Sequence, residues 1–214
     1  FTATEWFGWI DMEEAVTEAF STAAELSGID FGAQEPRMRI IKEEYGRETL
    51  RLTHYWRGPH TTAGSPPGIR LDITRDEVLA FEPVLRSVSH RFSDSERLAP
   101  FRIRCYALEE VMAEKVRAVL GQRIFAVSRD LYDIYSLLDM VDEERVLEGL
   151  PKKTDVRGLD LEDIKGSRLT HRREEFRADW GRNLVHLLPP GGEVEFDEVW
   201  DPVAEFVTRV VAAL

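Results

Sequence analysis

A lysine interrupts the apolar stripe of a helix that the sequence predicts over residues 107–121. At about 100° per residue, one face of this helix gathers five apolar side chains: Leu108, Val111, Met112, Val116 and Val119. Lys115 lies within that stripe, and Arg123 falls near the same side two turns later. Such a lysine either extends its stem along the core and keeps its ammonium in water, or brings a positive charge to an anion such as phosphate. The helical pattern alone leaves both interpretations open.

Two carboxylates follow on the next predicted helix, residues 129–141. In the segment SRDLYDIY, Ser128 is placed to act as the N-cap, and Asp130 and Asp133, three residues apart, share one face. A single aspartate in a first turn is common because it suits the helix dipole. Two of them, one helix after an inward-leaning lysine and arginine, predict a site with Lys115, Asp130 and Asp133 as candidate catalytic residues.

A third carboxylate, Asp72, lies on the short predicted strand IRLDIT (69–74), opposite the face shared by Ile69, Leu71 and Ile73. Carboxylates are the natural ligands of Mg²⁺, which is usually held by one or two of them together with substrate phosphates. Asp72 is therefore a candidate metal ligand, although one carboxylate does not make a site. The histidines show no zinc-site spacing, and the sequence has no P-loop, GxGxxG or GxSxG motif.

The composition is that of a globular protein in a reducing compartment. The 214 residues are 43% hydrophobic, and a single cysteine excludes an internal disulfide framework, so we expect a cytoplasmic protein without a membrane span. The formal net charge of −12 repels nucleic acid, so any such contact needs a local basic patch. The segment KGSRLTHRR (165–173) and the pair Arg102/Arg104 are candidates, although a solvated helix face is the favoured interpretation of 165–173.

The predicted elements change character near residue 106. A helix over 11–27 is followed by a hairpin that turns at 45–48, by the strand 69–74, and by strands around 84–92 and 101–106. Helices are then predicted over 107–121, 129–141, 171–188 and 199–213, with a loop or short irregular helix over 149–168. A strand-rich half thus precedes a helical half.

Four segments in order carry a family resemblance: IRLDIT, YALEEVMAEKVRAVLGQR, RDLYDIYSLL and FRADWGRNLVHLL, with a terminal FDEVWDPVAEFV. Over about residues 68–214 they resemble the AbiEii family of nucleotidyltransferase-like toxins, the toxin halves of bacterial and archaeal toxin–antitoxin systems. The resemblance implies an α+β fold, with a nucleotidyltransferase-like mixed β-sheet and flanking helices followed by a helical C-terminal half. It implies two domains: a sheet domain over 1–106, truncated at its N-terminus, and a helical domain over 107–214.

The resemblance also implies roles for the candidate residues. Asp72 matches an acidic metal position of the sheet, and Lys115 matches a lysine that contacts the triphosphate. Asp130 and Asp133 match the acidic motif of the helical half, with Arg123 and Arg129 at basic positions around it. The implied reaction is attack of an acceptor hydroxyl on the α-phosphate of a nucleoside triphosphate with Mg²⁺ as cofactor. Transfer RNA is an implied acceptor, and an antitoxin protein is an implied partner.

Members of that family begin with a Gly-Gly or Gly-Ser turn and a strand carrying D-x-D. The opening FTATEW is similar to the residues that directly follow D-x-D, so we expect these motifs to precede Phe1. Two alternatives to the enzyme stay open. One is a nucleotidyltransferase-like binding module that has lost catalysis. The other is a metal-dependent nuclease that uses Asp72 with Glu114 and Lys115.

Overall fold

The computed structural model describes residues 1–3, 7–42, 48–60, 64–74, 77–89, 93, 101–155, 158, 167–189 and 191–214. These residues form an α+β structure, which confirms the predicted fold class. The chain divides into two compact units, Phe1–Glu77 and Val78–Leu214. In the part of the chain that is described, none of the helices combines the length and apolar character that crossing a membrane requires.

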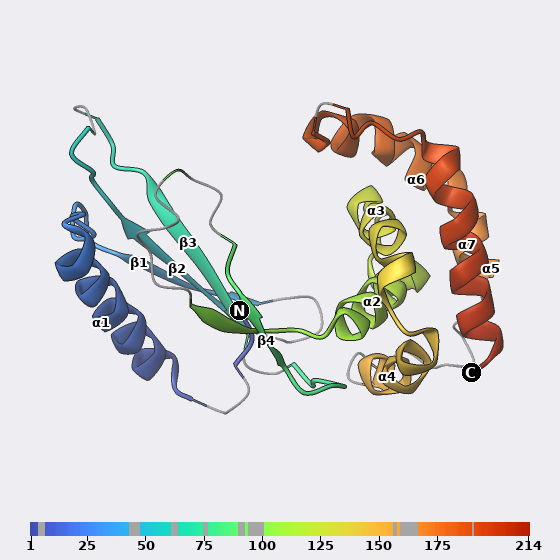
Figure 1. The fold of residues 1–214 in the computed structure, drawn as a ribbon, viewed down its shortest axis with the longest axis horizontal. Helices are drawn as coiled ribbons and strands as arrows, with labels where there is room; N and C mark the ends of the chain where they lie inside the picture. Colours follow the sequence, from blue (N-terminus) through green and yellow to red (C-terminus); the bar gives the residue numbers. More distant parts are fainter. Residues whose placement is uncertain are drawn as a thin grey trace. The chain divides into compact units, whose positions relative to one another are not determined.

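The first unit contains a three-stranded antiparallel sheet in the order β1-β2-β3, drawn in Figure 1. Its strands are β1 (Arg37–Lys42), β2 (Glu48–Tyr55) and β3 (Gly68–Thr74), so the predicted hairpin and the predicted strand at 69–74 are confirmed. The predicted turn at 45–48 falls largely outside the described residues. Next to β3, Thr2 forms a parallel bridge with Thr74, and the Ala3 amide donates to the Thr74 carbonyl at 2.8 Å.

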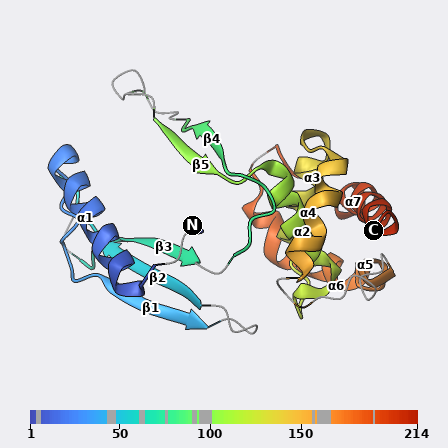
Figure 2. The ribbon, with the colours of Figure 1, turned by 90° about the horizontal axis from the view of Figure 1, so that it is seen from below.

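One face of this sheet is covered by α1 (Trp9–Ser27), as Figure 2 shows. The helix ends at Gly28, whose φ of 69° is left-handed, as predicted for a glycine C-cap. Alternate residues of β2 face α1, so Leu50 and Leu52 are fully buried and form a small core with Ile73. The remaining residues of β2 point to the opposite face of the sheet.

The second unit begins with a two-stranded hairpin of β4 (Val84–Ser87) and β5 (Arg102–Cys105). Beyond it, the chain is helical. Its helices are α2 (Leu108–Arg117), α3 (Ser128–Leu137), α4 (Glu143–Asp155), α5 (Ser167–His171), α6 (Arg173–Asp179) and α7 (Phe196–Ala212). A π-helical turn, Ala118–Gln122, continues α2. The switch from strand to helix predicted near residue 106 is confirmed, whereas the division into functional domains at that residue stays a prediction.

The helices of the second unit pack around one apolar core. It includes Met112 and Val116 of α2, Leu131 and Ile134 of α3, and Phe206 of α7. Residues of α7 enter this core every three or four positions, as an amphipathic helix requires. Of the apolar stripe predicted around Lys115, Met112, Val116 and Val119 lie in this core, whereas Leu108 and Val111 are only partly buried.

The helix α4 departs from the sequence expectation, since a loop or short irregular helix was predicted from residue 149. Gly149 and Pro151 are the cause, because both residues usually interrupt a helix. A Cβ built on Gly149 would lie 2.6 Å from Cε2 of Phe81. The glycine therefore permits close packing of Phe81 against the helix instead of ending it.

Candidate functional site

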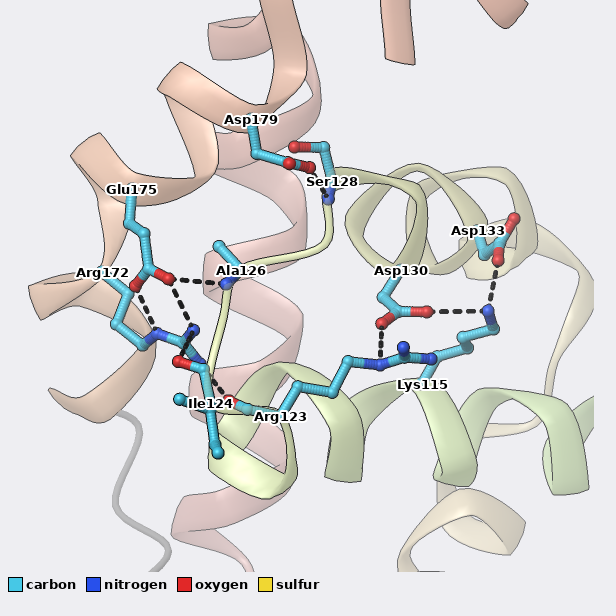
Figure 3. A network of polar contacts seen from close by, with 10 residues as sticks. All are labelled: Lys115, Arg123, Ile124, Ala126, Ser128, Asp130, Asp133, Arg172, Glu175 and Asp179. Atoms are coloured by element: carbon cyan, nitrogen blue, oxygen red, sulfur yellow. Dashed lines mark hydrogen bonds and ion pairs between the residues drawn. The ribbon is translucent and has the colours of Figure 1, made fainter. Parts of the chain in front are cut away.

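Four of the predicted site residues meet in the second unit, in a cluster of alternating charges shown in Figure 3. The Lys115 ammonium donates to Oδ1 of Asp130 at 2.8 Å and forms an ion pair with Oδ2 of Asp133 at 2.5 Å. Nε of Arg123 lies 2.9 Å from the other oxygen of Asp130. We refer to Lys115, Arg123, Asp130 and Asp133 as the ion-pair cluster.

The cluster is graded from a buried centre to an exposed edge. The Asp130 side chain is only 3% exposed, and that of Lys115 is 26% exposed. Asp133 and Arg123 lie at the solvent side, and their side chains are 42% and 52% exposed. Asp130 reaches the centre because it lies in the first turn of α3, next to the core residue Leu131 and one turn before the core residue Ile134. A buried carboxylate thus holds two cations whose other surfaces face outward.

Lys115 stays charged in this environment. Burial lowers the pKa of its ammonium, but the hydrogen bonds to Asp130 and Asp133 outweigh this effect, so the pKa is raised above its ordinary value. The ammonium is held between two carboxylates, and a contact of Lys115 with phosphate stays a prediction.

The cluster retains donors for an anionic ligand. An ammonium has three N–H groups, and Lys115 uses two of them on Asp130 and Asp133. Arg123 contacts Asp130 through Nε, and it forms no ion pair with any other residue in the described part of the chain. One N–H of Lys115 and the outer edge of the Arg123 guanidinium are thus available to phosphate oxygens.

A second network fixes the segment that carries Arg123. Arg172 forms a bidentate pair with Glu175 and also donates to the carbonyls of Arg123 and Ile124, both at 3.3 Å. Glu175 accepts the amide hydrogen of Ala126 at 2.6 Å. The hydrogen bond from Arg172 is the main cause that lowers the pKa of Glu175. The backbone at 123–126 is therefore held from α6 and the turn before it (Figure 3).

The start of α3 is capped differently from the prediction. Ser128 was expected to be the N-cap, but its hydroxyl instead donates to the Phe176 carbonyl at 3.0 Å, so that prediction is wrong. Asp179 of α6 accepts the Ser128 amide hydrogen at 2.7 Å and so places a carboxylate at the N-terminus of α3. Burial raises the pKa of Asp179, but the hydrogen bonds from Ser128 and Asn183 outweigh it, and the pKa is lowered.

Sequence reasoning missed Arg172, Glu175 and Asp179, which lie about fifty residues from the backbone they hold. Their spacing of three and four residues places them on one side of a helix, which is the signal that the sequence offers. The sequence does not indicate which segment that side contacts. Arg172 also belongs to the basic stretch 165–173, and within the described part of that stretch it stabilises a loop.

Two predicted site residues lie outside the cluster. Arg129 is exposed, and it forms no ion pair with the residues that the structure describes. Asp72 belongs to the first unit, where Arg51 binds both of its oxygens at 2.6 and 2.8 Å. This hydrogen bonding is the main reason that the pKa of Asp72 is lowered. Asp72 is therefore an ionised carboxylate near neutral pH, and an arginine partner already occupies it.

The donors present do not complete a magnesium site. Over the described ranges, no group of three or more histidine, cysteine, aspartate and glutamate residues is arranged to hold a metal ion. Asp72 alone offers one carboxylate, and Arg51 neutralises it. The role of Asp72 as a metal ligand stays a prediction.

The sequence matches a known protein family. A family model described as nucleotidyl transferase AbiEii toxin, Type IV TA system, matches residues 1–202. No curated protein matches the sequence. The match extends over the first unit as well as most of the second, beyond the segments on which the sequence resemblance rests.

Proposed function

Since the chain belongs to the AbiEii family of nucleotidyltransferase toxins from type IV toxin–antitoxin systems, we propose that it transfers a nucleoside monophosphate from a nucleoside triphosphate to an acceptor hydroxyl. The observation that supports this proposal is the ion-pair cluster. It holds one lysine and one arginine at fixed positions, and both retain outward-facing donors. Such donors are suited to the phosphates of a nucleotide.

In the proposed reaction, the acceptor oxygen attacks the α-phosphorus, and the bond from this phosphorus to the bridging oxygen of the β-phosphate breaks. Pyrophosphate leaves with the electron pair of that bond, and the hydroxyl proton passes to solvent. Negative charge grows on the leaving group, where Lys115 and Arg123 stabilise it through charge-assisted hydrogen bonds. Asp130 and Asp133 orient the two cations, which therefore need little reorganisation during the reaction.

We also propose Mg²⁺ as the metal that accompanies the triphosphate, with Asp72 as one ligand. Because the described donors do not complete such a site, the reaction above is carried by Lys115 and Arg123 alone. A second ligand would be needed, and the parallel pairing of Thr2 with Thr74 supports a position for it. A residue that continued the extended segment before Phe1 would lie level with Asp72, and we propose that position for a second carboxylate.

The proposed partners follow from the family. A toxin of a toxin–antitoxin system has a cognate antitoxin, and we propose an antitoxin protein as a partner of this chain. We propose an RNA, in particular transfer RNA, as the acceptor. The nuclease alternative is disfavoured by Glu114, whose carboxylate lies 2.8 Å from the buried ammonium of Lys153 and is thus engaged inside the helical unit.

A label-transfer assay tests the proposed function. The protein, expressed with any residues that precede Phe1 in its gene, is incubated with total RNA, Mg²⁺ and each triphosphate labelled at either the α- or the γ-phosphate. We expect label from the α-phosphate in RNA and label from the γ-phosphate in pyrophosphate. Lys115→Met lowers the transfer at least tenfold, whereas the matched variant of an exposed lysine, Lys152→Met, leaves it unchanged.

Three other outcomes reject the proposal. Nucleotide binding without transfer of label indicates the catalytically inactive binding module. Fragmented RNA without label indicates the metal-dependent nuclease. Label from the γ-phosphate in RNA indicates phosphoryl transfer instead of nucleotidyl transfer.

A further inference from the structure

The face of the first unit's sheet that lies opposite α1 concentrates arginine. Because side chains alternate along a strand, the residues of β2 that do not face α1 share the opposite face with their neighbours on β1 and β3. This face is a groove of about 460 Å³. It is lined by Arg37, Arg39, Ile41, Arg51, Thr53, Tyr55, Gly68 and Arg70. We refer to it as the arginine face.

The strand register arranges these charges in two rows. Arg39 lies directly opposite Arg51, about 4.8 Å away across one strand spacing. Arg37 and Arg70 flank Thr53, one on each side, and so lie roughly 10 Å apart. The two rows are two residues apart, which is roughly 7 Å along a strand. The face is therefore an area of positive charge and not a single cationic point.

Most of this charge has no carboxylate partner among the described residues. Arg51 is neutralised by Asp72. Arg37, Arg39 and Arg70 are exposed and form no ion pair with the described part of the chain, although the charge of Arg70 helps to lower the pKa of Asp72. Like charges on adjacent strands destabilise a sheet, so such a group is favourable mainly when an anion binds to it.

An aromatic side chain lies beside these charges. Tyr55 is paired with Gly68 on β3. A Cβ at Gly68 would lie 2.8 Å from Cγ2 of Thr53 and 3.4 Å from the Tyr55 ring, so the glycine makes room for both side chains. The Arg37 guanidinium lies 5.9 Å from the ring centroid of Tyr55. A partly exposed ring among arginines matches the way in which single-stranded nucleic acids are bound, through phosphate contacts and base stacking.

The opposite side of the same unit has the opposite charge. Helix α1 contains five acidic residues and no basic residue: Asp11, Glu13, Glu14, Glu18 and Glu25. In a protein with a net charge of −12, this distribution repels a polyanion from the helix side and attracts it to the arginine face.

We propose that the arginine face binds the phosphate backbone of a single-stranded RNA, with one base stacked on Tyr55. The inference rests on the proposed function, because this RNA would be the acceptor. A polynucleotide fits the two rows better than one triphosphate does, since the charges come from three strands. An acidic peptide would satisfy the arginines but would leave the ring without a stacking partner.

The test measures the anisotropy of a fluorescently labelled single-stranded RNA oligonucleotide with the chain, without nucleotide or Mg²⁺. The sheet variant is Arg37→Ala/Arg39→Ala/Arg70→Ala. The matched control is Arg86→Ala/Arg102→Ala/Arg104→Ala on the β4–β5 hairpin, which removes the same charge from exposed positions and includes the pair Arg102/Arg104. Circular dichroism and thermal unfolding establish that both variants are folded.

We expect the sheet variant to bind at least tenfold more weakly and the hairpin variant to bind like the wild type. The slope of log K against log salt should become shallower by about 2 in the sheet variant, because three phosphate contacts contribute about 0.7 each. Tyr55→Ala should weaken binding at least fivefold, whereas Tyr55→Phe should retain it. Duplex RNA should bind more weakly than the single strand.

Equal binding by the wild type and the sheet variant overturns the inference, as does a loss confined to the hairpin variant. Displacement of the RNA by ATP at lower concentration than by unlabelled RNA would identify a triphosphate site instead. Displacement by poly-glutamate at lower concentration would identify an acidic protein partner. If the sheet variant transfers label to RNA as well as the wild type does, only the inference about the arginine face is rejected. If RNA binds at the arginine face but no label is transferred, only the proposed enzymatic function is rejected.

Discussion

Asp130 is the residue on which the ion-pair cluster depends. It is almost fully buried, yet it contacts two cations that come from different segments of the chain. Lys115 and Arg123 keep their positions because each has one bond to this carboxylate. Asp133 contacts the same lysine from the solvent side and contributes mainly through charge. The two aspartates, three residues apart, therefore have unequal energetic roles.

We predict that Asp130→Asn lowers the free energy of unfolding by about 2–3 kcal/mol, because it removes a buried charge that compensates two cations. Asp133→Asn serves as the control, and it should cost less than about 1 kcal/mol because its side chain is 42% exposed. Urea denaturation of both variants measures the difference. A cost for Asp133→Asn equal to that for Asp130→Asn would show that Asp130 is not the anchor.

His54 makes the stability of the first unit depend on pH. It is buried, stacks on Phe20 at 4.2 Å, and has no hydrogen-bond partner for Nε2 within the described residues. Burial lowers the pKa of this imidazole. The unfolded chain therefore binds a proton near pH 6.5 that the folded chain does not bind, and stability is lost as the pH falls below that value.

We expect the wild type to lose more thermal stability between pH 7.5 and pH 5.5 than His54→Phe loses. Phenylalanine keeps the stacking on Phe20 but does not titrate, so the difference between the two proteins reports the histidine. Parallel melting temperatures of the two proteins over this range would contradict the buried neutral state of His54.

The elements that hold the cluster act through contacts distant in sequence. The backbone at 123–126 and the first turn of α3 are held by Arg172, Glu175 and Asp179. Local periodicity predicted that Lys115, Asp130 and Asp133 would lie on particular helix faces, and these residues do meet. It did not predict the contribution of α6, because the packing partner of a helix face depends on the whole core. For the same reason the sequence indicated Ser128 as a cap, whereas a carboxylate from another helix has that role.

Asp179→Ala should destabilise the protein by about 1 kcal/mol, because it removes the acceptor at the N-terminus of α3. Glu174→Ala, a change of an 81% exposed carboxylate on the same helix, should alter stability by less than about 0.5 kcal/mol. Chemical denaturation compares the two variants. Equal effects would show that the contact from Asp179 to α3 contributes nothing specific.

A further prediction concerns the contact between Gly149 of α4 and Phe81. Gly149→Ala should cost about 1–3 kcal/mol, although alanine favours a helix, because the added Cβ would lie 2.6 Å from the Phe81 ring. The smaller side chain of Phe81→Leu should reduce this cost in the double variant. A double-mutant cycle in urea measures the coupling between the two positions. A stabilising effect of Gly149→Ala alone would show that the glycine is not required for packing.

The candidate functional residues of the molecule are divided between two compact units. The second unit contains the ion-pair cluster, and the first contains Asp72 and the arginine face. The sequence predicted the α+β class and nearly every strand, because alternation and turn residues are local signals. The functional domain boundary at residue 106, where helices begin, stays a prediction. The compact units divide after Glu77, because β4 and β5 pair with each other and not with the β1–β3 sheet.

Net charge was also a poor guide to local charge. The value of −12 indicated that the molecule repels nucleic acid, and the basic stretch 165–173 was one of the few visible exceptions. The arginines of the first unit come from three strands and are separated in sequence by up to 33 positions. They form a single surface only through the strand register, which was not available from composition or from sequence runs.

We propose that the ion-pair cluster around Lys115 binds the phosphates of a nucleoside triphosphate. Calorimetric titration with non-hydrolysable analogues of the four triphosphates tests it directly, because this measurement does not require turnover. We predict that at least one analogue binds the wild type, that Lys115→Met weakens this binding tenfold or more, and that Lys152→Met leaves it unchanged. Equal affinity of the wild type and Lys115→Met for every analogue that binds would show that Lys115 does not contact the triphosphate.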